Sequence, residues 1–302
     1  MIVTNYINLL LDKIEAKNAK HATKLRVNLR DFGDDYFQLG NSFYKKYENY
    51  LHSVNLDLDY GVDCYLKMLE DMLEQRMMFT RDGSYSNTSF AEVEKQIYSN
   101  PEIMQYHMHG LVLAQFLWFE QYERIKFFVE NLEKYFNKAQ KYLEIGGGHG
   151  LYINEAMKLL PETTQFDLVD ISNSSLTLAK GILNTDRINY FLKNIFDFTN
   201  DVVYDFVTMG EVLEHVEDPL SLLEKIANHL SSTGVCFLTT PINAPMIDHI
   251  YLFNEEEEIR ELFAKSGFEI LEEKIVISEK VTPEIADRFK LPVMYAAFIK
   301  KK

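Results

Sequence analysis

The stretch YLEIGGGHGLYINEAM, residues 142–157, constrains the fold of this chain more than any other feature. An apolar run typical of a buried strand leads directly into a cluster of glycines, and an amphipathic segment typical of a helix follows. Glu144, Gly146, Gly148 and Gly150 occupy every second position across this junction. Glycines there let the backbone turn sharply and bring its amides close to a ligand at the start of the helix. The stretch therefore predicts a strand, a ligand-binding loop and a helix in succession.

From Lys141 onward, short apolar runs alternate with amphipathic segments, as in an α/β fold with a doubly wound, mostly parallel sheet. The expected strands are KYLEI, QFDLVDI, INYFL, DFVTM, GVCFLTT, FEILEEKIVI and VMYAAFIK. The expected helices between them cover 151–160, 174–183, 219–230 and 255–266. The last two strands are joined by SEKVTPEIADRFKLP, in which no helix is expected, so they can pair antiparallel.

The preceding residues have a different texture, with helical spacing of apolar side chains and almost no strand pattern. We therefore expect two domains, an all-α domain at 1–138 and the α/β domain at 139–302.

Composition limits the class of partner. The net charge of −15 and the pI near 5.0 disfavour a broad nucleic-acid interface, because phosphate binding needs clustered lysine and arginine, and they favour a small or cationic substrate. Cys64 and Cys236 are too few for a disulfide framework and suit a reducing compartment. The longest strongly apolar run, LVLAQFLWF at 111–119, is too short to span a bilayer. A cytoplasmic protein without a membrane segment is expected.

Two features select the class of ligand at the glycine loop. A dinucleotide fingerprint places its third glycine three residues after the second, whereas Gly150 follows Gly148 by two, which disfavours a dehydrogenase. About one strand-and-helix unit later, Asp170 ends the strand FDLVD, where a carboxylate can hold the two hydroxyls of a ribose. Loop and acid together indicate an adenosine-containing ligand.

Over roughly residues 139–302 the sequence resembles the class I S-adenosylmethionine-dependent methyltransferases, through LEIGGGHG, DLVDIS, NIFDF, YDFVTMGEVLEHVEDP, LSSTGVCFLTTPIN and LFAKSGFEI. The resemblance implies S-adenosylmethionine as cofactor, bound by Glu144, Gly146, Gly148, Gly150, Asp170, Asn194, Ile195 and Glu211. Glu144 and the glycine loop would surround the methionine part, Asp170 the ribose, and Asn194 with Ile195 the adenine. Asn194 stands where many relatives carry an acid. His149, within the loop, either lines the pocket or packs.

Two stretches carry candidate groups for catalysis. Glu211, Glu214 and His215 follow the fourth expected strand, and Asp248 with His249 follow the fifth. The carboxyl ends of these adjacent strands share one rim, so the groups can meet. The pattern E-x-x-E-H with a later histidine resembles the metal site of small-RNA 3′-terminal 2′-O-methyltransferases, and its first part resembles ubiquinone-pathway O-methyltransferases. The resemblance implies a divalent metal (Mn, Fe, Mg or Zn) bound by Glu211, Glu214, His215 and His249.

We therefore expect a methyltransferase that acts on oxygen of a small molecule, with His215, His249 and Glu214 as catalytic residues and the metal orienting and acidifying the acceptor hydroxyl. The nearest alternative is a metal-independent N- or C-methyltransferase with His215 or His249 as general base. An RNA 3′-end 2′-O-methyltransferase conflicts with the acidic composition, and a non-catalytic cofactor-binding subunit conflicts with the intact glycine loop.

The helical domain is expected to lie over the cofactor as a lid or substrate domain, and its apolar surface could also form a homodimer interface. Most of its helix-spaced aromatic and methionine side chains should pack in the core. The candidate pocket residues are Tyr106, His107, His109, Gln115, Trp118 and Tyr122, and one or two of the six are expected to reach the substrate.

Overall fold

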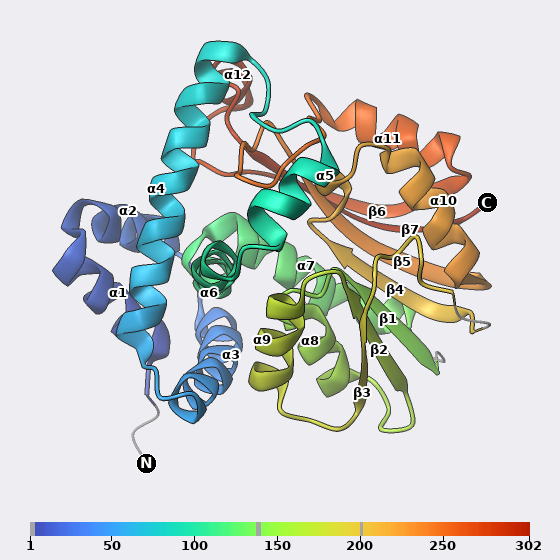
Figure 1. Ribbon diagram of the computed structural model, residues 1–302, viewed down its shortest axis with the longest axis horizontal. Helices are drawn as coiled ribbons and strands as arrows, with labels where there is room; N and C mark the ends of the chain where they lie inside the picture. The colour runs from blue at the N-terminus through green and yellow to red at the C-terminus, as the bar shows by residue number, and fades with distance from the viewer. Residues whose placement is uncertain (1–3, 137–139, 200–201) are drawn as a thin grey trace.

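A seven-stranded sheet forms the centre of this protein (Figure 1). The computed structural model describes residues 4–136, 140–199 and 202–302 of the chain. Its strands are β1 (Lys141–Ile145), β2 (Gln165–Asp170), β3 (Ile188–Leu192), β4 (Tyr204–Gly210), β5 (Leu230–Ile242), β6 (Phe268–Ile277) and β7 (Val293–Lys301). They form one seven-stranded sheet in the order β3-β2-β1-β4-β5-β7-β6. The first five strands run parallel, and β7 is antiparallel to both β5 and β6. The expected doubly wound, mostly parallel fold is confirmed.

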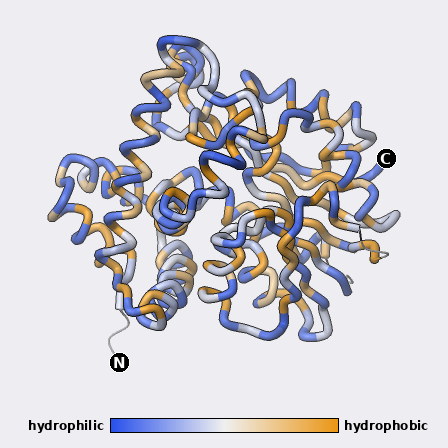
Figure 2. The backbone as a smooth tube through the Cα atoms, viewed as in Figure 1, coloured by the Kyte–Doolittle hydropathy of each residue, from blue (hydrophilic) through white to orange (hydrophobic). Residues whose placement is uncertain are grey.

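Successive residues of the central strands point to opposite faces of the sheet, which divides the core into two layers. Tyr142 and Phe206 belong to the layer shared with α7, α8 and α9, whereas the adjacent Leu143 and Val207 pack with α10 and α11. These flanking helices are α7 (Phe119–Tyr135), α8 (Leu151–Leu159), α9 (Asn173–Leu183), α10 (Pro219–His229) and α11 (Glu256–Lys265). Figure 2 shows the hydrophobic residues concentrated along the central strands.

The chain before the sheet is helical, as expected. Its elements are α1 (Tyr6–Lys17), α2 (Ala19–Leu29), α3 (Asp34–Ser53), α4 (Leu58–Asp82), α5 (Phe90–Val93), the π-helical turn η1 (Glu94–Tyr98) and α6 (Pro101–Leu117). Figure 1 shows α1, α2 and α4 on the side away from the sheet, with α5 and α6 between them and it. The expected domain boundary between residues 138 and 139 lies outside the described residues. Among the described helices, none has the length and apolar character needed to cross a membrane.

The connection between β6 and β7 differs from the sequence expectation. The segment SEKVTPEIADRFKLP contains a short helix, α12 (Pro283–Arg288), where none was expected. Pro283 occupies its first turn, a position that suits proline because its missing N–H has no helical partner there. The antiparallel pairing of β6 with β7 holds all the same.

The packing of α3 against α9 leads to a prediction about Gly181. A Cβ at this position would lie 2.1 Å from Cδ2 of Tyr50 on α3. In an isolated helix, alanine would stabilise relative to glycine by about 1 kcal/mol. Here we expect Gly181→Ala to lower the free energy of unfolding by about 1–3 kcal/mol, because the partly buried ring of Tyr50, which packs against the core, must move. Urea denaturation tests this, with Gly181→Ala in a Tyr50→Ala background as control, where the cost should vanish. A stabilised single variant would contradict the close approach of α3 to α9.

Candidate functional site

A cavity of about 970 Å³ lies at the carboxyl edge of the sheet. Its walls include the glycine loop after β1, the ends of β2 and β3, and the segments after β4 and β5, while α2, α4 and α6 close it from the helical side. The strand order reverses direction between β1 and β4, and open α/β sheets bind ligands at such a reversal. Its size is at the upper end of typical ligand sites, which leaves room for two ligands side by side.

The glycine loop has the backbone geometry that only glycine adopts readily. Gly146, Gly148 and Gly150 all have positive φ, at 65°, 49° and 72°. A Cβ on Gly146 would lie 2.5 Å from Cγ2 of Val212, in the segment after β4. Gly146 and Gly148 line the cavity, whereas Gly150 begins α8 and packs against Leu183 instead. The structure thus separates two lining glycines from one that shapes the turn.

Two buried carboxyl groups flank this loop. Asp170, at the end of β2, accepts hydrogen bonds from the backbone N–H of Gly148 at 3.1 Å and of Ser172 at 2.8 Å. Burial raises the pKa of Asp170 to about 6 despite these bonds. Glu144, at the strand end preceding the loop, accepts from the N–H of Ile153 at 2.6 Å, and burial raises its pKa to about 8. Both groups line the cavity.

The remaining residues expected around an adenosyl ligand also reach the cavity. Asn194 and Ile195 line it from the segment after β3. The Asn194 side-chain oxygen accepts from the N–H of Phe196 at 3.0 Å, which leaves its NH₂ group for a ligand. His149 lines the cavity too, with Nδ1 accepting from the N–H of Leu151 at 3.2 Å and its ring edge-on to Phe43. His149 therefore both packs and faces the cavity.

Three of the four expected metal ligands lie together. Glu214 and His215 belong to the 3₁₀ turn η2 (Leu213–His215) after β4, and His249 follows β5. Each offers one ligand atom, and these atoms lie within 4.8 Å of one another. Oε1 of Glu214 lies 3.7 Å from Nε2 of His215 and 3.9 Å from Nε2 of His249. Two backbone hydrogen bonds from the N–H groups of Ile250 and Tyr251 to the Glu214 carbonyl hold the two segments together.

The outer atoms of these three side chains are already hydrogen-bonded. Nδ1 of His215 lies 2.9 Å from the carbonyl oxygen of Asp248, and Nδ1 of His249 lies 2.7 Å from that of Ala244, so each Nδ1 carries the proton and donates it. Oε2 of Glu214 accepts from the Thr240 hydroxyl at 2.9 Å. Oε1 of Glu214, in a fully buried side chain, has no hydrogen-bond partner among the described residues. One oxygen and two imidazole lone pairs therefore face the same space.

The pKa values of the three clustered side chains are shifted in different directions. Burial raises the pKa of Glu214 above its usual range, and the nearby charge of Glu211 adds to this effect. Burial lowers the pKa of His249. For His215 the burial effect also lowers the pKa, but the carboxylates of Asp248 and Glu214 outweigh it and raise the pKa.

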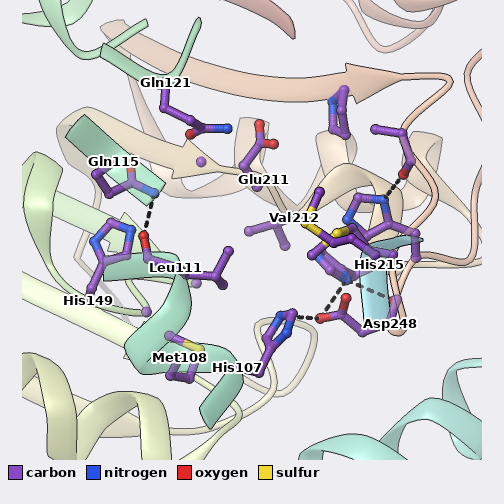
Figure 3. A pocket seen from close by; sticks show the side chains of 18 of the residues that line it. His107, Met108, Leu111, Gln115, Gln121, His149, Glu211, Val212, His215 and Asp248 are labelled. Atoms are coloured by element: carbon purple, nitrogen blue, oxygen red, sulfur yellow. Dashed lines mark hydrogen bonds and ion pairs between the residues drawn. The ribbon is translucent and has the colours of Figure 1, made fainter. Parts of the chain in front are cut away.

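Glu211 lies outside the group of three, contrary to the expectation of four ligands. Its Oε1 pairs with Nη1 of Arg124 at 2.8 Å and accepts from the Thr239 hydroxyl at 2.7 Å. Arg124 is 97% buried in the side chain, and its Nη2 donates to the side-chain oxygens of Gln115 and Gln121. Glu211 has a φ of 56°, a rare backbone conformation for a side chain of this kind that often marks a functional site. Figure 3 shows Gln115, Gln121 and Glu211 across the cavity from His107 and Asp248.

The sequence did not single out Arg124, although it lines the cavity. An arginine within a helical pattern is normally predicted to be exposed, because charged side chains are seldom buried. The position of Arg124 in the sequence could have indicated that it is buried, because it lies on the last helix before the sheet and that helix packs against β5, β6 and β7.

The helical half supplies three of the six candidates named above. His107, Gln115 and Trp118 line the cavity, whereas the other three are engaged elsewhere. The Tyr106 hydroxyl donates to Asp71, Nδ1 of His109 bonds to the Tyr47 hydroxyl, and Tyr122 packs edge-on against Tyr36.

A tyrosine of the π-helical turn was also missed. The Tyr98 hydroxyl lies 3.0 Å from Nδ1 of His215 and 3.5 Å from Oδ2 of Asp248. Asp248 in turn lies 3.7 Å from Nε2 of His107 (Figure 3). The helical half thus contacts the side chains that support His215.

Comparison with known proteins identifies relatives of this chain. A family model described as a methyltransferase domain matches residues 117–273. The ubiquinone biosynthesis O-methyltransferase of Rickettsia canadensis is 24% identical over 200 residues, covering 59% of this chain and 84% of that protein. The Rickettsia typhi protein of the same name is 28% identical over 121 residues, covering 39% and 48%. The chain spans about half the length of most of the curated relatives that it matches.

Two solved structures share the fold. The mitomycin 7-O-methyltransferase MmcR is 14% identical with a TM-score of 0.54, covering 81% of this chain and 72% of that one. The plantazolicin methyltransferase BpumL, in complex with S-adenosylhomocysteine (SAH), is 15% identical with a TM-score of 0.50, covering 76% and 99%. At these identities the likeness concerns the fold.

Proposed function

Because this chain belongs to the class I S-adenosylmethionine-dependent methyltransferases, we propose that it methylates a hydroxyl oxygen of a small molecule and that Glu214, His215 and His249 hold a divalent metal ion beside that hydroxyl. The relatives of this chain include O-methyltransferases of ubiquinone biosynthesis, which supports oxygen as the acceptor atom. The observation that carries the proposal is the position of Glu214 Oε1, which faces two imidazole Nε2 atoms and has no hydrogen-bond partner within the described part of the chain.

The donor side of the cavity fits S-adenosylmethionine, which supplies an electrophilic methyl group on its sulfonium. Asp170 offers carboxylate oxygens to ribose hydroxyls, and Asn194 with Ile195 forms the wall for the adenine. The glycine loop and Glu144 surround the methionine part, next to Glu211 and Arg124. Gly150 contributes only by shaping the turn.

The three-residue cluster fits a metal by the chemistry of its donors. Two neutral imidazoles and one carboxylate are a common set for Zn, Mn or Fe, and a catalytic site keeps further positions open for substrate. Ligand histidines in such sites donate their second N–H to a carbonyl or carboxylate, as His215 and His249 do here. A bound divalent ion would lower the pKa of an acceptor hydroxyl and orient its oxygen.

The protein's own groups support the transfer. The carbonyl of Asp248 and the Tyr98 hydroxyl fix the ring of His215, so that its Nε2 faces the cavity. Helices α4 and α6 close the cavity over the donor and acceptor. Excluding water in this way strengthens electrostatic interactions within the site and prevents hydrolysis of the donor. We assign the helical half, residues 1–138, this lid and substrate-binding role.

Chelation distinguishes the proposal from a metal-independent mechanism in which His215 is the general base. We expect EDTA to abolish turnover and added Mn²⁺ or Mg²⁺ to restore it, and the apo protein to bind Mn²⁺ in an electron paramagnetic resonance titration. Full turnover in EDTA, with no Mn²⁺ bound, would support the general base, because Asp248 already raises the pKa of His215.

Asp170 gives a prediction for cofactor binding. Asp170→Asn should weaken the binding of SAH about 10- to 100-fold, since bonds to a charged acceptor contribute about 1.5–3 kcal/mol. The pKa of Asp170 is raised to about 6, so the carboxylate predominates above pH 6 and is lost below it. The affinity of the native protein for SAH should therefore fall as the pH drops through 6, and the asparagine variant should show no such fall. Calorimetry from pH 5 to 8 measures both; parallel pH profiles would refute this role.

A further inference from the structure

The cavity continues beyond the donor and metal sites into the helical half. His21, Lys24 and Leu25 of α2, Leu69 and Leu73 of α4, and Trp118 and Glu120 at the junction of α6 and α7 line this extension, which we call the helical compartment. The hydrogen bonds of Trp118 locate the compartment. Nε1 of Trp118 donates to the Tyr65 hydroxyl of α4 at 2.7 Å, and that hydroxyl lies 2.8 Å from Nε2 of His21 on α2. The compartment therefore lies between α2 and α4.

Helix α4 gives the compartment an apolar wall. Leu66, Leu69 and Leu73 line the cavity, followed by Arg76. Their spacing of three and four residues places these side chains on one face of the helix. Ten residues of α-helix extend about 15 Å, so the wall is longer than a single aromatic ring. Leu73 remains 65% exposed although it lines the cavity. This wall suits an elongated apolar group.

The two lysines at this end of the cavity already have acidic partners, whereas Arg76 bonds to neutral carbonyl groups. Nζ of Lys24 pairs with Glu279 at 2.5 Å, and Lys17 pairs with Asp63. Arg76 donates to the carbonyl oxygens of Phe289 at 2.6 Å and of Asn243 at 3.4 Å. The two lysines are therefore not free to bind an anionic group, and Arg76 already uses two of its five N–H donors on backbone carbonyl oxygens.

Glu120 is the opposite case. It is 93% buried and lines the cavity, and its carboxyl group accepts a hydrogen bond from its own backbone amide but forms none, and no ion pair, with another side chain in the described part of the chain. Lys24 and Arg124 are near enough to act on it electrostatically, but Lys24 pairs with Glu279 and Arg124 with Glu211. A buried carboxyl group bonded only by its own backbone amide lacks a charged partner, and a ligand that supplies a cationic donor stabilises its ionised form.

We propose that the helical compartment binds the distal part of the methyl acceptor, and that this part is an apolar group carrying an ammonium that pairs with Glu120. The proposal rests on the proposed function in one respect, namely that the acceptor reacts beside Glu214 in the same cavity. A protein with a net charge of −15 also attracts cations toward its openings. The ammonium would give Glu120 the cationic partner that Lys24 and Arg124 do not provide, and the apolar group would cover the leucines of α4.

Protonation of Glu120 makes the binding pH-dependent. Burial raises the pKa of Glu120 to about 8, and the charge of Glu279 adds to this effect, whereas the hydrogen bond from its own backbone amide and the charges of Arg124 and Lys24 oppose it. Below pH 8 an arriving ammonium must therefore displace a proton from Glu120. We expect amine affinity to rise by up to about tenfold per pH unit up to pH 8 and then to level off, because alkylamines stay protonated to about pH 10.

Trp118 is the single tryptophan of the chain and lines the compartment, so its fluorescence reports occupancy directly. The probes are n-octylamine, n-octanol and octanoate, which share one chain length and differ in the head group. At pH 8 we expect n-octylamine to bind at least about tenfold more tightly than n-octanol, and octanoate more weakly than both. Glu120→Gln should remove the advantage of the amine and leave n-octanol binding unchanged.

A matched control is Glu70→Gln, which removes a carboxylate that lines the same cavity but is exposed and pairs with Lys67 at 3.6 Å. It should retain the preference for the amine. Equal binding of amine and alcohol to the native protein, or an amine preference that survives Glu120→Gln, would overturn the proposal. SAH calorimetry on the same variants separates this outcome from failure of the proposed function, since the donor residues are untouched by Glu120→Gln.

Discussion

Glu214→Gln is expected to abolish metal binding and to lower kcat by about 10²- to 10⁴-fold, the range that loss of a catalytic group usually causes. The substituted amide keeps the shape of the side chain and can still accept from the Thr240 hydroxyl, so folding should be preserved. It loses the negative charge on Oε1, which faces Nε2 of His215 and His249. Mn²⁺ titration by electron paramagnetic resonance and steady-state turnover measure the two effects separately.

The matched control for this variant is Glu217→Gln. Glu217 also lines the cavity, and its Oε1 accepts from the backbone N–H of Phe90, a bond that glutamine can keep. It should bind Mn²⁺ as the native protein does. If Glu214→Gln kept both Mn²⁺ affinity and turnover, the metal assignment would be wrong, and turnover lost without loss of Mn²⁺ would assign Glu214 a role apart from the metal.

The second large effect is expected at the ion pair between Arg124 and Glu211. Glu211→Ala should lower the free energy of unfolding by about 3 kcal/mol, because it leaves the buried guanidinium without its carboxylate partner. Arg124→Met should cost less, because the side chain of Glu211 is 26% exposed and faces the cavity. Urea denaturation followed by circular dichroism gives both values.

The double variant Arg124→Met/Glu211→Ala completes the cycle. We expect it to be more stable than the sum of the single effects predicts, by about 1–3 kcal/mol, since neither charge is then left alone. Simple additivity would show that the two groups are not coupled. SAH binding should weaken in all three variants, because the pair lies beside the methionine part of the proposed donor site.

The strands and glycine positions could be predicted from the sequence because they depend on local physical rules. Alternating apolar residues such as Tyr142 and Leu143 fill the two faces of the sheet, and the positive φ values of Gly146 and Gly148 require glycine. The position of Asp170 could be predicted for the same reason, because the end of the second parallel strand has a fixed place in such a fold. Short α12 was missed because six residues carry little periodicity.

The partners of individual side chains could not be predicted from the sequence in this way. Glu211 and Glu214 belong to one motif, yet one pairs with Arg124 of α7 and the other faces two histidines. A positive φ at Glu211 separates their directions, and nothing in the spacing of the motif encodes that backbone conformation. Likewise, Tyr98 acquires its role from contacts with His215 and Asp248, more than a hundred residues away, and Glu120 acquires its role from its burial in the tertiary structure.

The sequence by itself determined the parallel sheet, the glycine loop and the rim where Glu214, His215 and His249 meet, because hydrophobic periodicity and glycine chemistry act between near neighbours in the chain. Only the tertiary structure decided which buried charges have partners and which do not. Burial and pairing depend on the distances between helices and strands that are remote in sequence, and the cost of an unpaired group exists only once water has been excluded from it.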